Sequence, residues 1–131
     1  MTSTPSTVRY TRLLILINAL FWLAFSVITA VGAHPSYEEA SVLRWAMATA
    51  ALLVAGILGT LAGRLQSRSR LVYWLAVTSL AAMTVAAVLD ELGPADIVYI
   101  IMTLLPLALL LKDRDWYQGM VIRTDQDQRA A

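Results

Sequence analysis

The sequence predicts an all-α integral membrane protein in which four transmembrane helices form an up-down antiparallel bundle. Its 131 residues contain four long apolar runs, each close to the ~20 residues that cross a hydrocarbon core of ~30 Å. Hydrophobic residues make up 59% of the chain and charged residues only 15%, whereas soluble domains carry about 25% charged residues. The few charges gather in short segments between the runs and near the two ends of the chain.

The apolar runs and the residues around them predict where each helix begins and ends. The chain is expected to form one membrane domain, with spans at approximately 10–32, 37–63, 71–92 and 95–112 and a flexible tail at 118–131. Gly32 is placed to end the first helix. Ser36, with Glu39 three residues later, has the spacing of a capping box at the start of the second. Pro94 suits the first position of the fourth helix. Cleavage of the first run as a signal peptide is the alternative, but such peptides have only about 7–15 apolar residues.

The distribution of positive charge predicts that both termini lie in the cytoplasm. Four spans place the termini and the turn at 64–70 on one side of the membrane. Nine of the ten cations are on that side: Arg9, Arg12, Arg64, Arg68, Arg70, Lys112, Arg114, Arg123 and Arg129. Only Arg44 is on the other side. Because cytoplasmic loops are enriched in Lys and Arg, we expect an N-in, C-in protein of the cell membrane, and specifically a bacterial cytoplasmic membrane.

Small residues recur at every fourth position of the second span, at Ala51, Ala55, Gly59 and Gly63. Residues four apart share a helix face, but each step of four turns about 40° around the axis, so this stripe winds by about 120°. Lipid tails are as apolar as leucine, so membrane helices associate mainly through close backbone approach at small residues. We therefore expect the stripe to pack against a neighbouring helix that crosses it at an angle.

A second stripe with the same spacing lies on the third span, at Thr78, Ala82 and Ala86. The loops between the spans are short, and short loops make consecutive helices neighbours in a bundle. The sequence therefore predicts that the stripe on the third span packs against the stripe on the second.

Two features of the first and fourth spans suggest polar contacts or bending within the membrane. Asn18 and Trp22 are four residues apart and share one face of the first span. We expect Asn18 to make a polar contact with another helix, beside Trp22; contact with a ligand inside the bundle is the alternative. Pro106 has no backbone N–H to donate, so it is expected to bend the fourth span, with a hinge as the alternative.

The outer side carries a single cation and several carboxylates. We expect Arg44 to pair with Asp90, Glu91 or Asp96 and so to hold the two outer loops together. A metal or substrate site among these carboxylates is the alternative, but the chain has only one histidine and no cysteine to complete it. We therefore expect neither a metal site nor a cofactor.

The absence of charge from the centres of the spans bears most directly on function. None of the four runs contains Asp, Glu, Lys, Arg or His near its centre, whereas transporters and proton pathways usually need such a group. We expect a non-enzymatic accessory subunit or self-associating scaffold whose partners are the bilayer and another membrane protein or a second copy, not nucleic acid. The first alternative is a small transporter, channel or lipid-binding protein, with a polar lining of Asn18, Thr49, Ser79, Thr84 and Thr103. The second is a membrane enzyme that uses the outer carboxylates.

Overall fold

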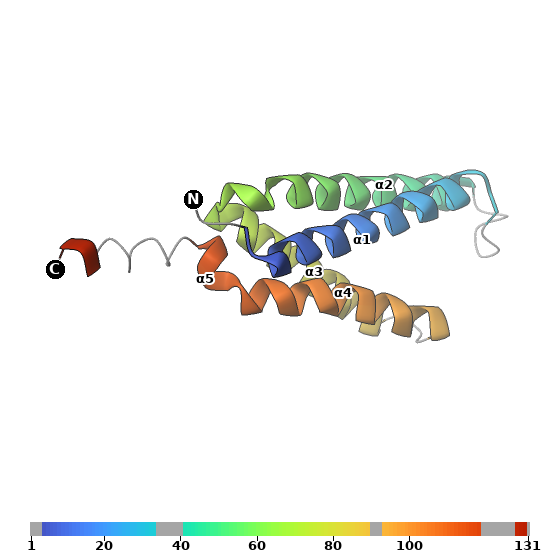
Figure 1. Cartoon of the computed structure of the whole chain (residues 1–131). Helices are drawn as coiled ribbons and strands as arrows, with labels where there is room; N and C mark the ends of the chain where they lie inside the picture. The colour runs from blue at the N-terminus through green and yellow to red at the C-terminus, as the bar shows by residue number, and fades with distance from the viewer. Residues whose placement is uncertain (1–3, 34–40, 90–92, 119–127, 131) are drawn as a thin grey trace.

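The computed structural model describes residues 4–33, 41–89, 93–118 and 128–130, and all regular elements in these ranges are helices. Four are long and apolar enough to cross a membrane: α1 (Ser6–Ala30), α2 (Ser41–Arg64), α3 (Arg70–Leu89) and α4 (Pro94–Lys112). The 3-10 helix η2 (Leu65–Ser67) continues α2, and the short helix α5 (Arg114–Tyr117) follows α4 (Figure 1). The four predicted apolar helices are thus confirmed. Helix α4 continues through Pro106, and a bend there stays a prediction.

Helix α1 ends at Ala30, and Gly32 lies just beyond it, where the sequence predicts a glycine that stops the helix. Gly32 adopts a φ of 75°, which is open to glycine and strained for most other residues. Its N–H donates to the carbonyl of Thr29 at 3.1 Å, and the N–H of Ala33 donates to the carbonyl of Ile28 at 3.1 Å. This pair of hydrogen bonds is a Schellman motif, which satisfies carbonyls that the helix itself leaves free.

Local chemistry also sets the start of α4. Pro94 is its first residue, as predicted, and Gly93 precedes it as the N-cap. The side chain of Asp96 accepts a hydrogen bond from the backbone N–H of Gly93 at 2.8 Å. The capping box predicted at Ser36 and Glu39 lies outside the described residues.

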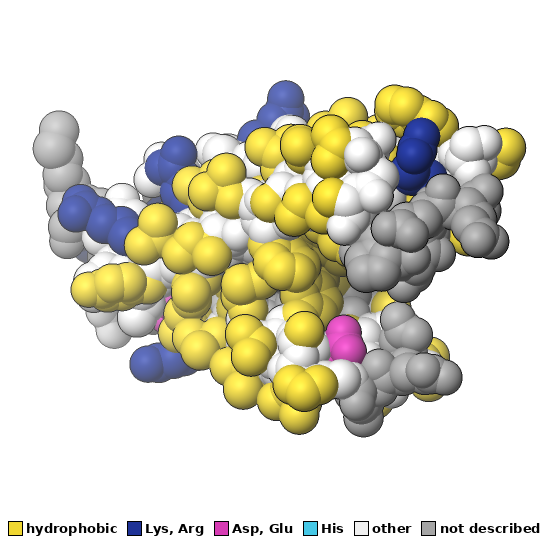
Figure 2. Space-filling view, turned by 90° about the vertical axis from the view of Figure 1, so that its right-hand side faces the viewer, with side chains coloured by type: hydrophobic (Ala, Val, Ile, Leu, Met, Phe, Trp, Pro, Cys, Tyr) yellow, Lys and Arg dark blue, Asp and Glu magenta, His cyan; other side chains and the backbone are white. Residues whose placement is uncertain are grey.

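The long helices associate as two pairs. Helix α1 packs along α2 and α3 packs along α4. Helix α1 contacts α4 about as extensively as α3 does, whereas α2 meets α3 only over a short stretch. Figure 1 shows the two pairs close together at the end with the termini and apart at the opposite end. Figure 2 shows the molecule from that opposite end. Apolar side chains cover much of the described surface in this view, and the charged side chains are few.

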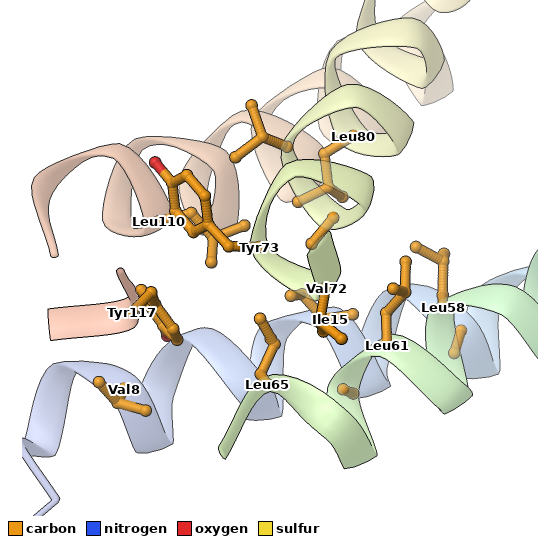
Figure 3. Close-up of a cluster of buried hydrophobic side chains, with 14 residues drawn as sticks. Val8, Ile15, Leu58, Leu61, Leu65, Val72, Tyr73, Leu80, Leu110 and Tyr117 are labelled. Atoms are coloured by element: carbon orange, nitrogen blue, oxygen red, sulfur yellow. The ribbon is translucent and has the colours of Figure 1, made fainter. Parts of the chain in front are cut away.

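The buried core lies where the two pairs meet. Apolar side chains from all four long helices and from η2 and α5 come together there (Figure 3). The largest fully buried ones are Val8, Ile15, Leu58, Leu65, Tyr73, Leu80, Leu110 and Tyr117. The buried residues of α3 end at Leu80, and beyond it Val85, Val88 and Leu89 are each more than half exposed. The cluster in which all four long helices meet therefore lies toward the end of the molecule that carries the termini.

The first two small residues of the α2 stripe, Ala51 and Ala55, lie in the contact with α1 and not with α3, which differs from the pairing that the sequence predicts. Ala51 and Ala55 are only 1% and 8% exposed. One turn before Ala51, the hydroxyl of Ser26 on α1 donates to the carbonyl of Ala48 at 2.7 Å. A hydrogen bond from a short side chain to the backbone of another helix requires the two helices to approach closely.

The stripe on α3 lies on the wrong face for the predicted pairing. Thr78, Ala82 and Ala86 are all exposed. Leu80, which is fully buried, is two positions from both Thr78 and Ala82. At about 100° per residue, two positions place a side chain nearly on the opposite side of the helix. The face of α3 that enters the core consists of Val72, Tyr73, Ala76, Val77 and Leu80.

Candidate functional site

The candidate functional surface is a face of α2 that no other described helix covers. Gly56 and Gly63 on this face are exposed, and Gly59 is half-buried. A methyl group built on any of these three glycines would have no neighbouring heavy atom within 4 Å. The described chain therefore does not use these glycines for its own close packing. In a soluble helix each glycine would weaken the helix by roughly 1 kcal/mol relative to alanine.

This face carries a shallow, widely open groove with about 410 Å³ of space over it. Its lining consists of Leu52, Leu53, Gly56, Ile57, Thr60 and Leu61. The hydroxyl of Thr60 donates to the carbonyl of Gly56 at 2.8 Å, so its proton is not available to a partner. The groove thus offers apolar contact and close backbone approach, without an acid, a base or a nucleophile.

A set of polar contacts joins α1 to α4 within the apolar runs. Asn18 is fully buried, and its Nδ2 donates to Oγ1 of Thr103 at 3.3 Å. Oγ1 of Thr103 in turn donates to the carbonyl of Tyr99 at 2.9 Å. One turn along α1, Nε1 of Trp22 donates to the hydroxyl of Tyr99 at 3.0 Å, and the two rings meet edge to face with centroids 5.8 Å apart. Asn18 and Trp22 therefore both bind the same face of α4.

Asn18 is only partly satisfied by this contact, which leads to a prediction. Its buried Oδ1 has no hydrogen-bond partner in the described chain. A buried unpaired polar atom costs about 1–3 kcal/mol, whereas one interhelical hydrogen bond in a membrane returns about 0.6 kcal/mol on average. Asn18→Leu is expected to leave the free energy of unfolding unchanged or to raise it by about 1 kcal/mol, as measured by detergent-induced unfolding. A loss above ~2 kcal/mol would contradict this, because Oδ1 would then have a partner.

Arg44 does not pair with Asp96, the described member of the three carboxylates predicted as its partners. Arg44 lies against the end of α1, where its Nη1 would be 3.0 Å from a methyl group built on Gly32. Asp96 is held by the backbone at the start of its own helix. Asp90 and Glu91 lie outside the described residues, so a link from Arg44 to either of them stays a prediction.

At the end with the termini, α5 folds back against the bundle. Tyr117 is 1% exposed, and its ring stacks on Tyr73 with centroids 5.7 Å apart, close to Val8 in Figure 3. Burial raises the pKa of Tyr117 to about 12; the Thr11 hydroxyl offsets part of this increase and the Asp113 carboxylate adds to it. The Tyr117 and Thr11 hydroxyls do not meet with hydrogen-bond geometry, so the buried Tyr117 hydroxyl has no hydrogen-bond partner in the part of the chain that the structure describes.

The sequence did not reveal the partners of Asn18 and Trp22 on α4. Those partners, Thr103 and Tyr99, are also four residues apart, so the matching spacing on the two helices was the available signal. The stacking of Tyr117 on Tyr73 has no comparable signal, because it depends on the direction in which α5 leaves α4.

Comparisons with protein-family models, with curated proteins and with solved structures find no match to this chain.

Proposed function

We propose that this chain is a non-enzymatic membrane protein that works through helix contacts, and that it associates with a second copy through the uncovered face of α2. One observation carries the proposal: Gly56, Gly59 and Gly63 lie in a membrane-length helix with open space at all three positions. Small residues let two membrane helices approach closely, which supplies the dispersion contacts that drive their association.

The shape of the face supports a second copy as the partner. Gly56 lies in the groove, while Leu53 and Ile57, both more than half exposed, stand beside it. One helix face therefore carries both a groove and the side chains that can fill the groove of a second copy. A symmetric dimer places the same patch on both subunits, so such a self-complementary surface suits a two-fold axis along the membrane normal.

The arrangement in the membrane is part of the proposal. We place the four helices in up-down order with both termini in the cytoplasm and the protein in a bacterial cytoplasmic membrane. The distribution of cations, nine on the side of the termini against Arg44 on the other, supports this orientation. A parallel dimer through α2 keeps the same orientation in both copies.

Replacing Gly56 with leucine is expected to weaken self-association at least tenfold, because the leucine occupies the groove and keeps the two backbones apart. The free energy of association lost in this way should exceed the ~1.4 kcal/mol that a tenfold change represents. The fold should persist, since no neighbouring atom lies within 4 Å of the new side chain's first carbon. The measurement is energy transfer between donor- and acceptor-labelled copies in lipid vesicles over a range of protein-to-lipid ratios.

The matched control is Ala86→Leu, which also adds a leucine at an exposed small residue, but on α3. It should leave the energy transfer close to that of the parent protein. A parent protein that stays monomeric at every ratio would exclude self-association. Equal effects of the two substitutions would show that the contact is not at the groove of α2.

A second candidate function, a small transporter or lipid-binding protein, is favoured by one observation. The helix pairs separate away from the termini, and α1 carries two buried polar atoms without described partners, Oδ1 of Asn18 and Oγ1 of Thr29. Under this alternative Asn18→Leu abolishes uptake or ligand binding while the fold is retained. Under the dimer proposal it leaves self-association unchanged.

A further inference from the structure

The end with the termini carries a concentration of positive charge that self-association through α2 does not use. Apart from Arg129 in the described residues 128–130, the described cations there are Arg9, Arg12, Arg64, Arg68, Arg70, Lys112 and Arg114. The described carboxylates at this end belong to Asp113 and Asp115, and Asp115 already pairs with Arg114 at 3.5 Å. Most of this positive charge therefore lacks a counter-charge within the described chain.

Arg68 differs from the other cations because it is held in a fixed position. Its Nε donates to the carbonyl of Trp116 at 3.0 Å. Its guanidinium carbon lies 4.9 Å from the centroid of the Trp116 ring, within cation–π distance. These two contacts attach the turn between α2 and α3 to the end of α4 and α5.

The remaining donors of Arg68 suit a phosphate group. A guanidinium has five N–H groups in a planar fork, and the contact with Trp116 uses the one on Nε. No carboxylate in the described ranges lies within ion-pair distance of Arg68. Arg64 and Arg70 flank it in the same turn, which contains no acidic residue. A planar fork suits bidentate recognition of phosphate, and two further cations in the same turn add positive charge.

Exposed aromatic rings place this turn at the level of the lipid headgroups. Tyr10 and Trp74 are 62% and 55% exposed, and such rings gather at the interface between hydrocarbon and water. Trp74 lies four residues into α3, about 6 Å along the helix from Arg70 at a rise of about 1.5 Å per residue. Arg68 therefore lies slightly farther from the membrane centre than these aromatic rings, at the depth of the lipid phosphates.

We infer that Arg68, fixed by Trp116 and flanked by Arg64 and Arg70, binds the phosphate of an anionic phospholipid in the leaflet on the side of the termini. The bound headgroup neutralises part of the positive charge of the α2–α3 turn, which has no described carboxylate of its own. The site is distinct from the groove on α2.

The experiment titrates the detergent-solubilised full chain with phosphatidylglycerol or with zwitterionic phosphatidylcholine and counts bound lipids by native mass spectrometry. The parent protein is expected to retain phosphatidylglycerol preferentially. Arg68→Gln should weaken that binding about fivefold or more, which is the effect of one arginine near an anionic surface. Arg68→Lys should give an intermediate loss, because it keeps the charge but loses the planar fork.

The matched control is Arg114→Gln, which removes one charge from the same end but from a residue already paired with Asp115. It should bind phosphatidylglycerol like the parent protein, and equal losses in the two glutamine variants would overturn the site in favour of diffuse charge. Inorganic phosphate should not displace the lipid; displacement would show a site for free anions and overturn the lipid assignment. If Arg68→Gln fails to fold, Arg70→Gln, whose side chain is exposed, must still weaken binding for the inference to stand.

Discussion

Replacing Ala51 with leucine is expected to lower the free energy of unfolding by about 1–3 kcal/mol, because Ala51 is 1% exposed in the contact between α1 and α2. The added side chain must push the two helices apart or leave its preferred rotamer. The same separation breaks the hydrogen bond from Ser26 to the carbonyl of Ala48, which is 2.7 Å long. The change in the free energy of unfolding is measured by unfolding the protein with increasing amounts of a denaturing detergent and following its tryptophan fluorescence.

Ala86→Leu provides the comparison, because Ala86 belongs to the exposed stripe on α3. This substitution should change the free energy of unfolding by less than ~0.5 kcal/mol, as is usual for surface positions. If Ala86→Leu were as destabilising as Ala51→Leu, the α3 stripe would be packed, and the arrangement of helices in two pairs would be wrong. If neither substitution changed the free energy of unfolding, α1 and α2 would not be closely packed.

The sequence predicted the α2 stripe, but it did not predict what each part of the stripe contacts. The 40° drift at every fourth residue explains the difference. Ala51 and Ala55 face α1, Gly59 is half-buried, and by Gly63 the stripe has moved onto the exposed side. One stripe thus serves two surfaces, and only its first half belongs to the contact with α1.

The apolar pattern of the sequence could not show which helix faces are buried in the bundle, for a physical reason. In a membrane the buried and the lipid-facing sides of a helix are equally apolar, so hydrophobic periodicity does not mark the core. Helix ends were predictable because their chemistry is local: Gly32 at a positive φ and Pro94 in the first turn act on neighbouring backbone alone. The face of α3 occupied by Leu80 instead depends on how the two helix pairs cross.

Replacing Tyr117 with alanine is expected to lower the free energy of unfolding by about 3–5 kcal/mol, the usual cost of removing a buried aromatic side chain. Its ring stacks on Tyr73 and contacts Trp116 edge to face, with centroids 5.7 and 5.1 Å away. The same unfolding measurement applies. Tyr117→Phe keeps the ring and removes a buried hydroxyl that has no partner among the described residues, so it should retain the parent's stability at neutral pH.

The pH dependence of the free energy of unfolding tests whether Tyr117 stays buried in the detergent-solubilised protein. Its pKa rises from an ordinary value of 10.0 to about 12 in the folded chain because burial disfavours the phenolate. Below pH 10 the residue is protonated in both states and its stabilising contribution is complete. As the pH rises toward 12, the unfolded chain loses the proton first, so this contribution falls and is lost above the folded pKa.

Tyr117→Phe should therefore flatten the loss of stability between pH 10 and pH 12 while the other tyrosines continue to titrate. The difference between the two curves isolates Tyr117, whatever the remaining groups contribute. Parallel curves would mean that the Tyr117 hydroxyl meets water in the folded protein. Helix α5 would then not close this end of the bundle, and the fixed position of Arg68 against Trp116 would lose its support.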